Sequence, residues 1–267
     1  MIPNVLSIAG SDPSGGAGIQ ADLKTFSALG CYGMAALTAL TAQNTRGVSG
    51  VHVPPAAFVA AQIDAIFADV RVDAVKIGML ASGEVVEAVA DRLAAHGARN
   101  VVLDPVLVAT SGDSLGAPDV VDAMRRRLFP LAALVTPNTA EAGRLADAPE
   151  PQDVAGLEAV ARALHARGAR AALAKGGHLT GDAALDVLFD GETATTLRAP
   201  RVETRNTHGT GCTLSSAIAA FLAQGLALRP ATEAAKAYLT GALAASDRLQ
   251  VGSGEGHGPV HHFWERW

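Results

Sequence analysis

The sequence predicts an α/β protein with a mostly parallel central sheet, helices on both faces and a small antiparallel hairpin. Two observations predict this class. Short, nearly continuous apolar runs recur along the chain, as in strands that are buried on both faces. Longer segments with helical spacing separate these runs, and such alternation folds into right-handed crossovers on a parallel sheet. We expect residues 1–267 to form a single domain, because no linker or change of composition divides them.

The first part of the chain supplies the predicted parallel strands and their helices. The strands are residues 5–10, 34–40, 74–78, 101–105, 133–137 and 171–177. Helical spacing covers residues 20–30, 55–70, 84–97 and 157–168. Gly30, Gly97 and Gly168 stand where a left-handed residue commonly ends a helix, and Pro55 suits a first helical residue.

The pattern changes after residue 180. Residues 185–200 have the pattern of two strands joined by a turn at Asp190-Gly191, which predicts the antiparallel hairpin. Two long helical segments follow, residues 211–224 and 231–248. They are joined around Gly225 and Pro230, which are typical of a break between helices.

Composition and charge argue against several classes of function. The chain has 49% hydrophobic and 18% charged residues, enough apolar surface for a sizeable core. Its net charge of −5 argues against nucleic acid or an anionic membrane as a partner. Its two cysteines, Cys31 and Cys212, lie far apart in sequence, which favours a reducing compartment, and no apolar stretch is long enough to span a bilayer. We therefore expect a cytoplasmic protein.

Glycine and polar residues follow several of the predicted strands. In open α/β sheets ligands bind at the carboxyl ends of the strands, so we expect the site there. Residues 10–18, GSDPSGGAG, form one such turn, but they lack the spacing of a dinucleotide fingerprint and of a P-loop. They let the backbone approach a ligand closely, or they form only a tight strand-to-helix turn.

The residues 209–212, GTGC, stand at the start of a predicted helix. The backbone amides of Gly209, Thr210 and Gly211 would be free to bind an anion at the positive end of the helix dipole. We expect the dipole to lower the pKa of Cys212, so that its thiolate takes a proton from a substrate hydroxyl while the amides hold a phosphoryl group. The alternative is a small apolar cap with a buried, inert thiol.

Carboxylates and a lysine complete the candidate site. Asp104 ends a strand, and Glu141 follows Asn138 by one helical turn, a donor set that suits Mg²⁺. The alternative for this pair is a capping box at a helix start. Lys175 ends another strand, where it can neutralise phosphate or merely extend its amine to solvent.

Several long segments resemble the bacterial hydroxymethylpyrimidine/phosphomethylpyrimidine kinases of thiamine biosynthesis, members of the ribokinase-like superfamily. The likeness covers almost the whole chain. The matching segments are residues 8–30, 38–45, 76–80, 102–106, 111–113, 136–142, 175–178, 206–220 and 258–263.

The resemblance implies an activity, cofactors and roles for residues. The family uses ATP and Mg²⁺ to phosphorylate 4-amino-5-hydroxymethyl-2-methylpyrimidine and then its monophosphate, and its members are usually homodimers. It implies that Cys212 is the base beside an anion hole of Gly209, Thr210 and Gly211. The pyrimidine-binding positions are Gln43, Asp22, Gly10, Met79 and Val106. The ATP-binding positions are Lys175, Asn138 and Lys236, and the magnesium positions are Asp104 and Glu141.

Gln43 and Thr110 bear on specificity. An amide offers a donor and an acceptor together, which matches a ring nitrogen beside an exocyclic amine, so Gln43 favours a pyrimidine over the ring of a pyridoxal or pyridoxine kinase. Thr110 stands where the family often has lysine, which makes the second phosphorylation less secure than the first. A pyrimidine-binding relative without catalysis is the remaining alternative, and the intact GTGC segment argues against it.

Overall fold

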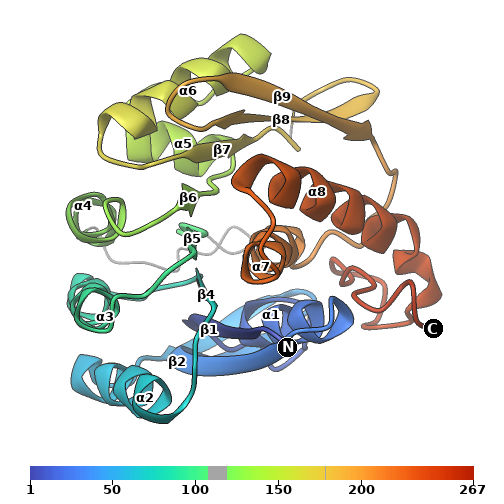
Figure 1. Cartoon of the computed structure of the whole chain (residues 1–267). Helices are drawn as coiled ribbons and strands as arrows, with labels where there is room; N and C mark the ends of the chain where they lie inside the picture. Colours follow the sequence, from blue (N-terminus) through green and yellow to red (C-terminus); the bar gives the residue numbers. More distant parts are fainter. Residues whose placement is uncertain (108–118, 178) are drawn as a thin grey trace.

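The computed structural model describes residues 1–107, 119–177 and 179–267. Within them one sheet of nine strands has the order β3-β2-β1-β4-β5-β6-β7-β8-β9 (Figure 1). The strands are β1 Asn4–Gly10, β2 Tyr32–Asn44, β3 Gly47–His52, β4 Ala74–Ile77, β5 Val101–Leu103, β6 Leu134–Val135, β7 Ala172–Lys175, β8 Ala183–Phe189 and β9 Ala194–Pro200. Pairing is parallel from β2 to β7 and antiparallel at both edges, which confirms the predicted class.

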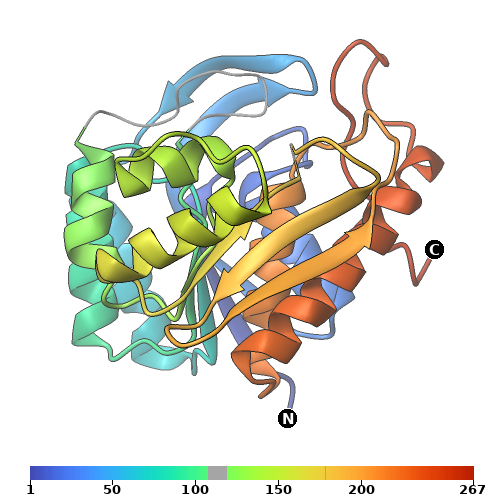
Figure 2. The ribbon, with the colours of Figure 1, turned by 90° about the horizontal axis from the view of Figure 1, so that it is seen from above.

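Helices cover both faces of the sheet (Figures 1 and 2). One layer holds α2 Ala56–Asp69, α3 Gly83–Ala95, α4 Val120–Ala123, α5 Thr139–Ala146 and α6 Val154–Ala166, and the π-helical turn Met124–Leu128 continues α4. The other layer holds α1 Gly18–Ala28, α7 Thr210–Ala223 and α8 Leu228–Ala244, and a short 3-10 turn, Ser246–Arg248, follows α8. Along β1, Leu6 and Ile8 face the first layer and Val5 faces the second, as the two-residue period of a strand requires.

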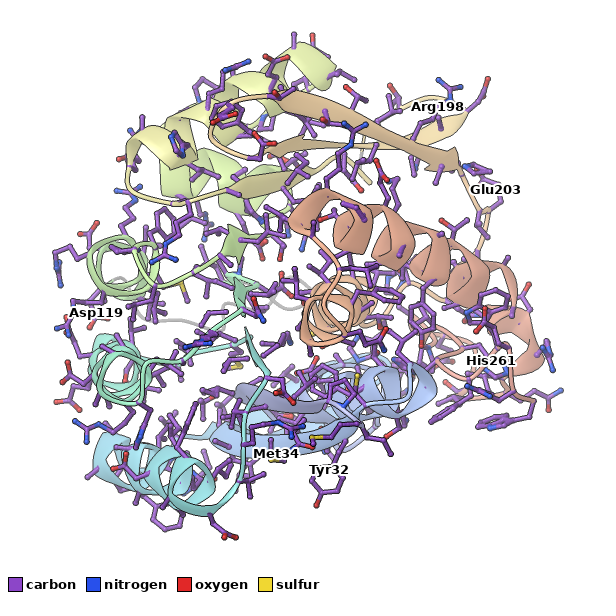
Figure 3. All side chains as sticks on the ribbon, in the orientation of Figure 1. Tyr32, Met34, Asp119, Arg198, Glu203 and His261 are labelled. Carbon is purple, nitrogen blue, oxygen red and sulfur yellow. The ribbon has the colours of Figure 1, made fainter. Side chains whose placement is uncertain are left out.

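Side chains fill the space between the sheet and the two helix layers, and Tyr32 points outward from the edge of β2 (Figure 3). None of the helices in the described part of the chain combines the length and apolar character needed to cross a membrane.

The predicted helix ends agree with the structure. Gly30, Gly97 and Gly168 have φ angles of +77°, +58° and +104°, which lie in the left-handed region that glycine adopts without strain. Pro55 lies one residue before α2 rather than inside it.

The sequence did not predict β3. Strand β2 runs on to Asn44, and a two-residue turn leads into β3, so the residues that follow the predicted strand 34–40 belong to an antiparallel hairpin. Residues of this hairpin are half-buried or exposed, and two of the six residues of β3 are glycines. An exposed strand lacks the continuous apolar run by which the buried strands were recognised.

Candidate active site

The start of α7 lies against the carboxyl ends of the parallel strands. Gly209 caps this helix with a φ angle of +80°, and a Cβ atom there would lie 1.8 Å from the carbonyl oxygen of Gly16. A Cβ atom on Gly211 would lie 3.3 Å from Lys175 Nζ and 3.5 Å from Asp104 Oδ2. Glycines therefore allow the first turn of α7 to contact the 10–18 turn on one side and the Asp104–Lys175 pair on the other.

Asp104 and Lys175 form a buried ion pair beside that turn. Lys175 Nζ lies 3.0 Å from Asp104 Oδ1, and the Ser215 hydroxyl donates to Oδ2 at 3.2 Å. Burial alone would raise the pKa of Asp104, but Lys175 and Lys76 outweigh it and hold that pKa below its usual range. Asp104 is therefore a carboxylate at neutral pH, next to the helix end where an anion would bind.

Glu141 is a second carboxyl group of the same cluster. Burial, with the charge of Asp104 adding to it, raises the pKa of Glu141 to about 7. A cation between the two groups would relieve this repulsion, so the donor set fits Mg²⁺. Among the described residues no group of three or more histidine, cysteine or acidic side chains could hold a metal alone, so other ligands would have to come from water or a bound phosphate.

Asn138 and Glu141 also form the capping box that was predicted as the alternative to a magnesium site. The Asn138 side chain accepts from the Glu141 backbone N–H at 2.9 Å, and Glu141 Oε2 accepts from the Asn138 N–H at 2.8 Å. The box satisfies two amides at the start of α5 and holds the carboxyl group of Glu141 at a fixed position. Contact of Asn138 with ATP stays a prediction.

The expected lowering of the Cys212 pKa is wrong. The thiol is half-buried and accepts a hydrogen bond from the backbone N–H of Gly18. Burial raises its pKa to about 11, and the nearby charges of Asp22 and Asp104 add to the rise. The lowering effect of Lys76 and of the Gly18 amide is smaller, so the thiol is protonated at neutral pH.

Asp12 organises the glycine-rich turn and was not predicted from the sequence. Its carboxylate accepts from the backbone N–H groups of Ser14, Gly16 and Ala17 at 2.8, 3.1 and 2.8 Å, and lies 2.8 Å from His208 Nε2. Despite burial, these hydrogen bonds lower its pKa to about 2. The Asp12–His208 contact joins the 10–18 turn to the segment before α7, and the acid placed two residues after the strand was the available signal.

Of the predicted pyrimidine-binding residues, Gly10, Met79 and Gln43 lie around the end of β1, and Val106 lies just after β5. A Cβ atom on Gly10 would lie 3.3 Å from Met79 Sδ, so these two residues are neighbours. Gln43 Oε1 accepts from the Thr41 hydroxyl, which also reaches the Ser11 carbonyl beside Gly10. Val106 is half-buried and follows Asp104, whose carbonyl accepts its N–H at 2.8 Å.

Asp22 is the fifth predicted pyrimidine-binding residue. Its side chain is fully buried, and it accepts from Ser7, Ser216 and Lys76. These donors enclose the carboxylate, so contact of Asp22 with the pyrimidine stays a prediction.

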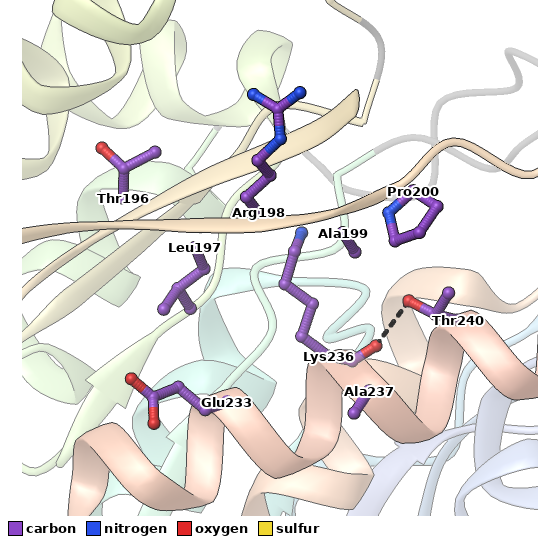
Figure 4. Close-up of a pocket in the computed structure, with 9 residues that line it drawn as sticks. All are labelled: Thr196, Leu197, Arg198, Ala199, Pro200, Glu233, Lys236, Ala237 and Thr240. Carbon is purple, nitrogen blue, oxygen red and sulfur yellow. Dashed lines mark hydrogen bonds between the residues drawn. The ribbon is translucent and has the colours of Figure 1, made fainter. Parts of the chain in front are cut away.

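Lys236, on α8, reaches Asp186 on β8, the strand partner of Lys175. Its Nζ donates to Asp186 Oδ2 at 2.6 Å. It lines a cavity of about 480 Å³ between β9 and α8 (Figure 4). Thr110 lies outside the described residues.

Comparison with known proteins places the chain in a family. A sequence profile of the phosphomethylpyrimidine kinases matches residues 12–261. The chain belongs to the phosphomethylpyrimidine kinase family. Among its relatives, a hydroxymethylpyrimidine/phosphomethylpyrimidine kinase of Rhizobium meliloti is 57% identical over 98% of this chain and 97% of its own length. A bifunctional thiamine biosynthesis protein of Geobacter sulfurreducens is 54% identical over 97% of this chain and 52% of its own length.

A solved relative confirms the ribokinase-like fold. The ADP complex of a Bacillus subtilis pyridoxal kinase superposes with a TM-score of 0.90, at 38% identity, over 100% of this chain and 99% of that one. The family resemblance predicted from the sequence is therefore confirmed. The last segment is packed, because His261 and His262 are both buried.

Proposed function

We propose that this chain is a kinase that uses ATP and Mg²⁺ to phosphorylate 4-amino-5-hydroxymethyl-2-methylpyrimidine, and then its monophosphate to the diphosphate, in thiamine biosynthesis. One observation carries the proposal. The glycine-flanked start of α7 meets a lysine and a carboxylate, Lys175 and Asp104, at the carboxyl edge of a parallel sheet. The names and high identity of the relatives support the substrate.

Each part of this site has a role in moving a phosphoryl group. The first-turn amides of α7 hold the transferring group, since helix N-termini bind phosphate, and Lys175 neutralises part of its charge. Asp104 and Glu141 would hold Mg²⁺, which neutralises phosphate oxygens when bound. The substrate hydroxyl attacks in line, an O–P bond forms, and the bond to the ADP oxygen breaks.

Cys212 receives the proton of the attacking hydroxyl in this proposal. Only the thiolate can accept it, and with a pKa of about 11 the thiol is largely protonated at neutral pH. In a loose transition state the hydroxyl loses its proton late, so catalysis depends mainly on positioning and charge. Any group that stabilises the thiolate would then increase the rate.

Gln43 recognises the pyrimidine in this account. Its amide pairs with a ring nitrogen and the adjacent exocyclic amine, while Gly10, Met79 and Val106 surround the ring. Lys236 and Asn138 contact the nucleotide. We also infer that the protein is a cytoplasmic homodimer, on the family resemblance.

Pyridoxal kinase is the second candidate, because a pyridoxal kinase superposes over the whole chain at a TM-score of 0.90. A coupled assay of ADP release with Mg²⁺ and ATP would compare the pyrimidine alcohol, its monophosphate and pyridoxal. We expect release with both pyrimidines and at least ~10-fold lower kcat/KM with pyridoxal, as a ring that leaves the Gln43 amide unpaired is disfavoured. Faster turnover of pyridoxal would favour the second candidate, and no release with any of the three would contradict kinase activity on these alcohols.

A further inference from the structure

Lys76 is a fully buried lysine that the proposed reaction leaves without a role. It lies on β4, its side chain is 0% exposed, and its Nζ lies 2.8 and 2.9 Å from the two oxygens of Asp22, which is also 0% exposed. Fully buried lysines are rare, and hydrophobic replacements of a buried ion pair are often at least as stable. Fold stability alone therefore gives a weak reason for this pair.

The Lys76–Asp22 pair lies near Cys212, and Asp22 joins α1 to α7 through Ser216. The Gly18 backbone N–H, at the start of α1, donates to the Cys212 sulfur. One turn further along both helices, the Ser216 hydroxyl donates to Asp22 Oδ1 at 2.7 Å. Gly18 to Asp22 and Cys212 to Ser216 are both steps of four residues, which stay on one face of a helix. The two contacts thus follow one another between the helices, separated by ~6 Å, the rise of four helical residues.

The Lys76 ammonium contacts Asp22 and extends toward the start of α7. A Cβ atom on Gly78, the residue that follows β4, would lie only 2.9 Å from Lys76 Nζ. The amine therefore lies beside the carboxyl end of β4, on the side of the first turn of α7. Burial by itself would lower the pKa of Lys76, but Asp22 outweighs it and the pKa is raised, so the amine stays charged.

Four charged groups act on the Cys212 sulfur from the elements around it. Lys76 on β4 and Lys175 at the end of β7 are positive, and Asp22 on α1 and Asp104 after β5 are negative. Lys76 is the largest of the influences that lower the pKa of the thiol, and Asp22 and Asp104 raise it. Lys175 is paired with Asp104 at the phosphate side.

We propose that Lys76 is a positioning residue of the reaction, which acts through Cys212 by fixing a permanent positive charge near the sulfur and so favouring the thiolate. This inference rests on the proposed function, in which Cys212 is the base. Asp22 holds the ammonium in place and moderates its effect.

The rate of alkylation of Cys212 by iodoacetamide, followed against pH by peptide mass spectrometry, tests the charge without any substrate. Lys76→Met leaves the Asp22 charge, so we expect alkylation at neutral pH to slow by at least ~10-fold, the effect of one pKa unit. Asp22→Asn keeps a hydrogen-bonding partner but leaves the ammonium, so alkylation should become faster. A merely structural role would move both variants in the same direction.

Two further variants keep the test decisive. Lys236→Met removes a lysine from a different buried ion pair and should leave the alkylation profile unchanged. Where Lys76→Met fails to fold, Lys76→Met with Asp22→Asn removes both charges, and its thiol should react more slowly than that of Asp22→Asn alone. Equal profiles for these two proteins, or for the wild type and a folded Lys76→Met protein, would overturn the proposal.

Steady-state kinetics separate this proposal from the proposed function. In Lys76→Met we expect kcat to fall while KM for ATP and pyrimidine stays unchanged, with kcat recovering at alkaline pH. Opposite shifts in alkylation without any pyrimidine-dependent ADP release would leave the charge effect standing and remove the kinase assignment. Normal turnover with no shift in alkylation would remove the proposed role of Lys76 and leave the kinase assignment standing.

Discussion

Glu141 combines a structural and a chemical role in one side chain, and this predicts how stability depends on pH. Its pKa is about 7 in the folded protein against 4.5 for an ordinary glutamic acid. A raised folded pKa means that its contribution to stability is present below the ordinary pKa and is lost as pH rises through about 7. Glu141→Gln removes the ionisation, and glutamine also completes capping boxes.

Urea unfolding of the wild type and Glu141→Gln at two pH values checks this prediction. We expect the variant to gain up to ~3 kcal/mol relative to the wild type between about pH 4 and pH 8, because the buried carboxyl group of the wild type ionises over this range and the amide does not. The same difference in unfolding free energy at both pH values would show that Glu141 does not ionise with a raised pKa.

Individual residues show what the sequence can and cannot predict. The positions of Cys212, Asp104 and Lys175 follow from the ends of strands and the start of a helix, and the structure brings Asp104 and Lys175 to the first turn of α7. The protonation of Cys212 was predicted wrongly. Its thiol is buried by segments that are far apart in sequence, and local sequence does not show this burial. Lys76 appeared as part of an ordinary apolar strand, since its partner Asp22 is 54 residues away.

At the scale of elements, the start of α7 depends on a glycine for two separate reasons. Gly209 needs a left-handed backbone, and it also needs the absence of a side chain next to Gly16. Gly30 is a matched control, because its φ angle of +77° is nearly the same but a Cβ atom there would have no neighbour within 4 Å.

The two alanine variants should differ clearly. Gly30→Ala should cost ~1 kcal/mol of unfolding free energy, from backbone strain alone. Gly209→Ala should cost at least twice as much and should also weaken binding of an ATP analogue in calorimetry, since the 10–18 turn must move away from α7. Similar losses of stability and no change in nucleotide affinity would contradict the role given to this helix start.

Elements were predictable where burial leaves a clear pattern. The six parallel strands and the β8–β9 hairpin were recognised from apolar runs and the turn at Asp190-Gly191. Strand β3 was missed because its residues are half-buried or exposed, and β6 was predicted too long because only two of its residues pair. Strand pairing at an edge depends on the partner strand, which local sequence does not contain.

At the scale of the whole molecule, the parallel sheet gathers the site from distant parts of the chain. Strands β1, β4, β5 and β7 all end at the same edge of the sheet, and α7 begins there. Residues as far apart in sequence as Gly10 and Cys212 therefore lie at one edge of the sheet. The central claim is that the first-turn amides of α7 hold the phosphoryl group that the enzyme transfers.

A crystal structure with Mg²⁺ and the non-hydrolysable ATP analogue AMP-PCP tests this claim most directly. We expect the terminal phosphate within hydrogen-bonding distance of the backbone amides of Gly211 and Cys212, with Lys175 on the same phosphate and the metal at Asp104. A terminal phosphate bound away from the start of α7, with those amides facing only solvent, would contradict the account.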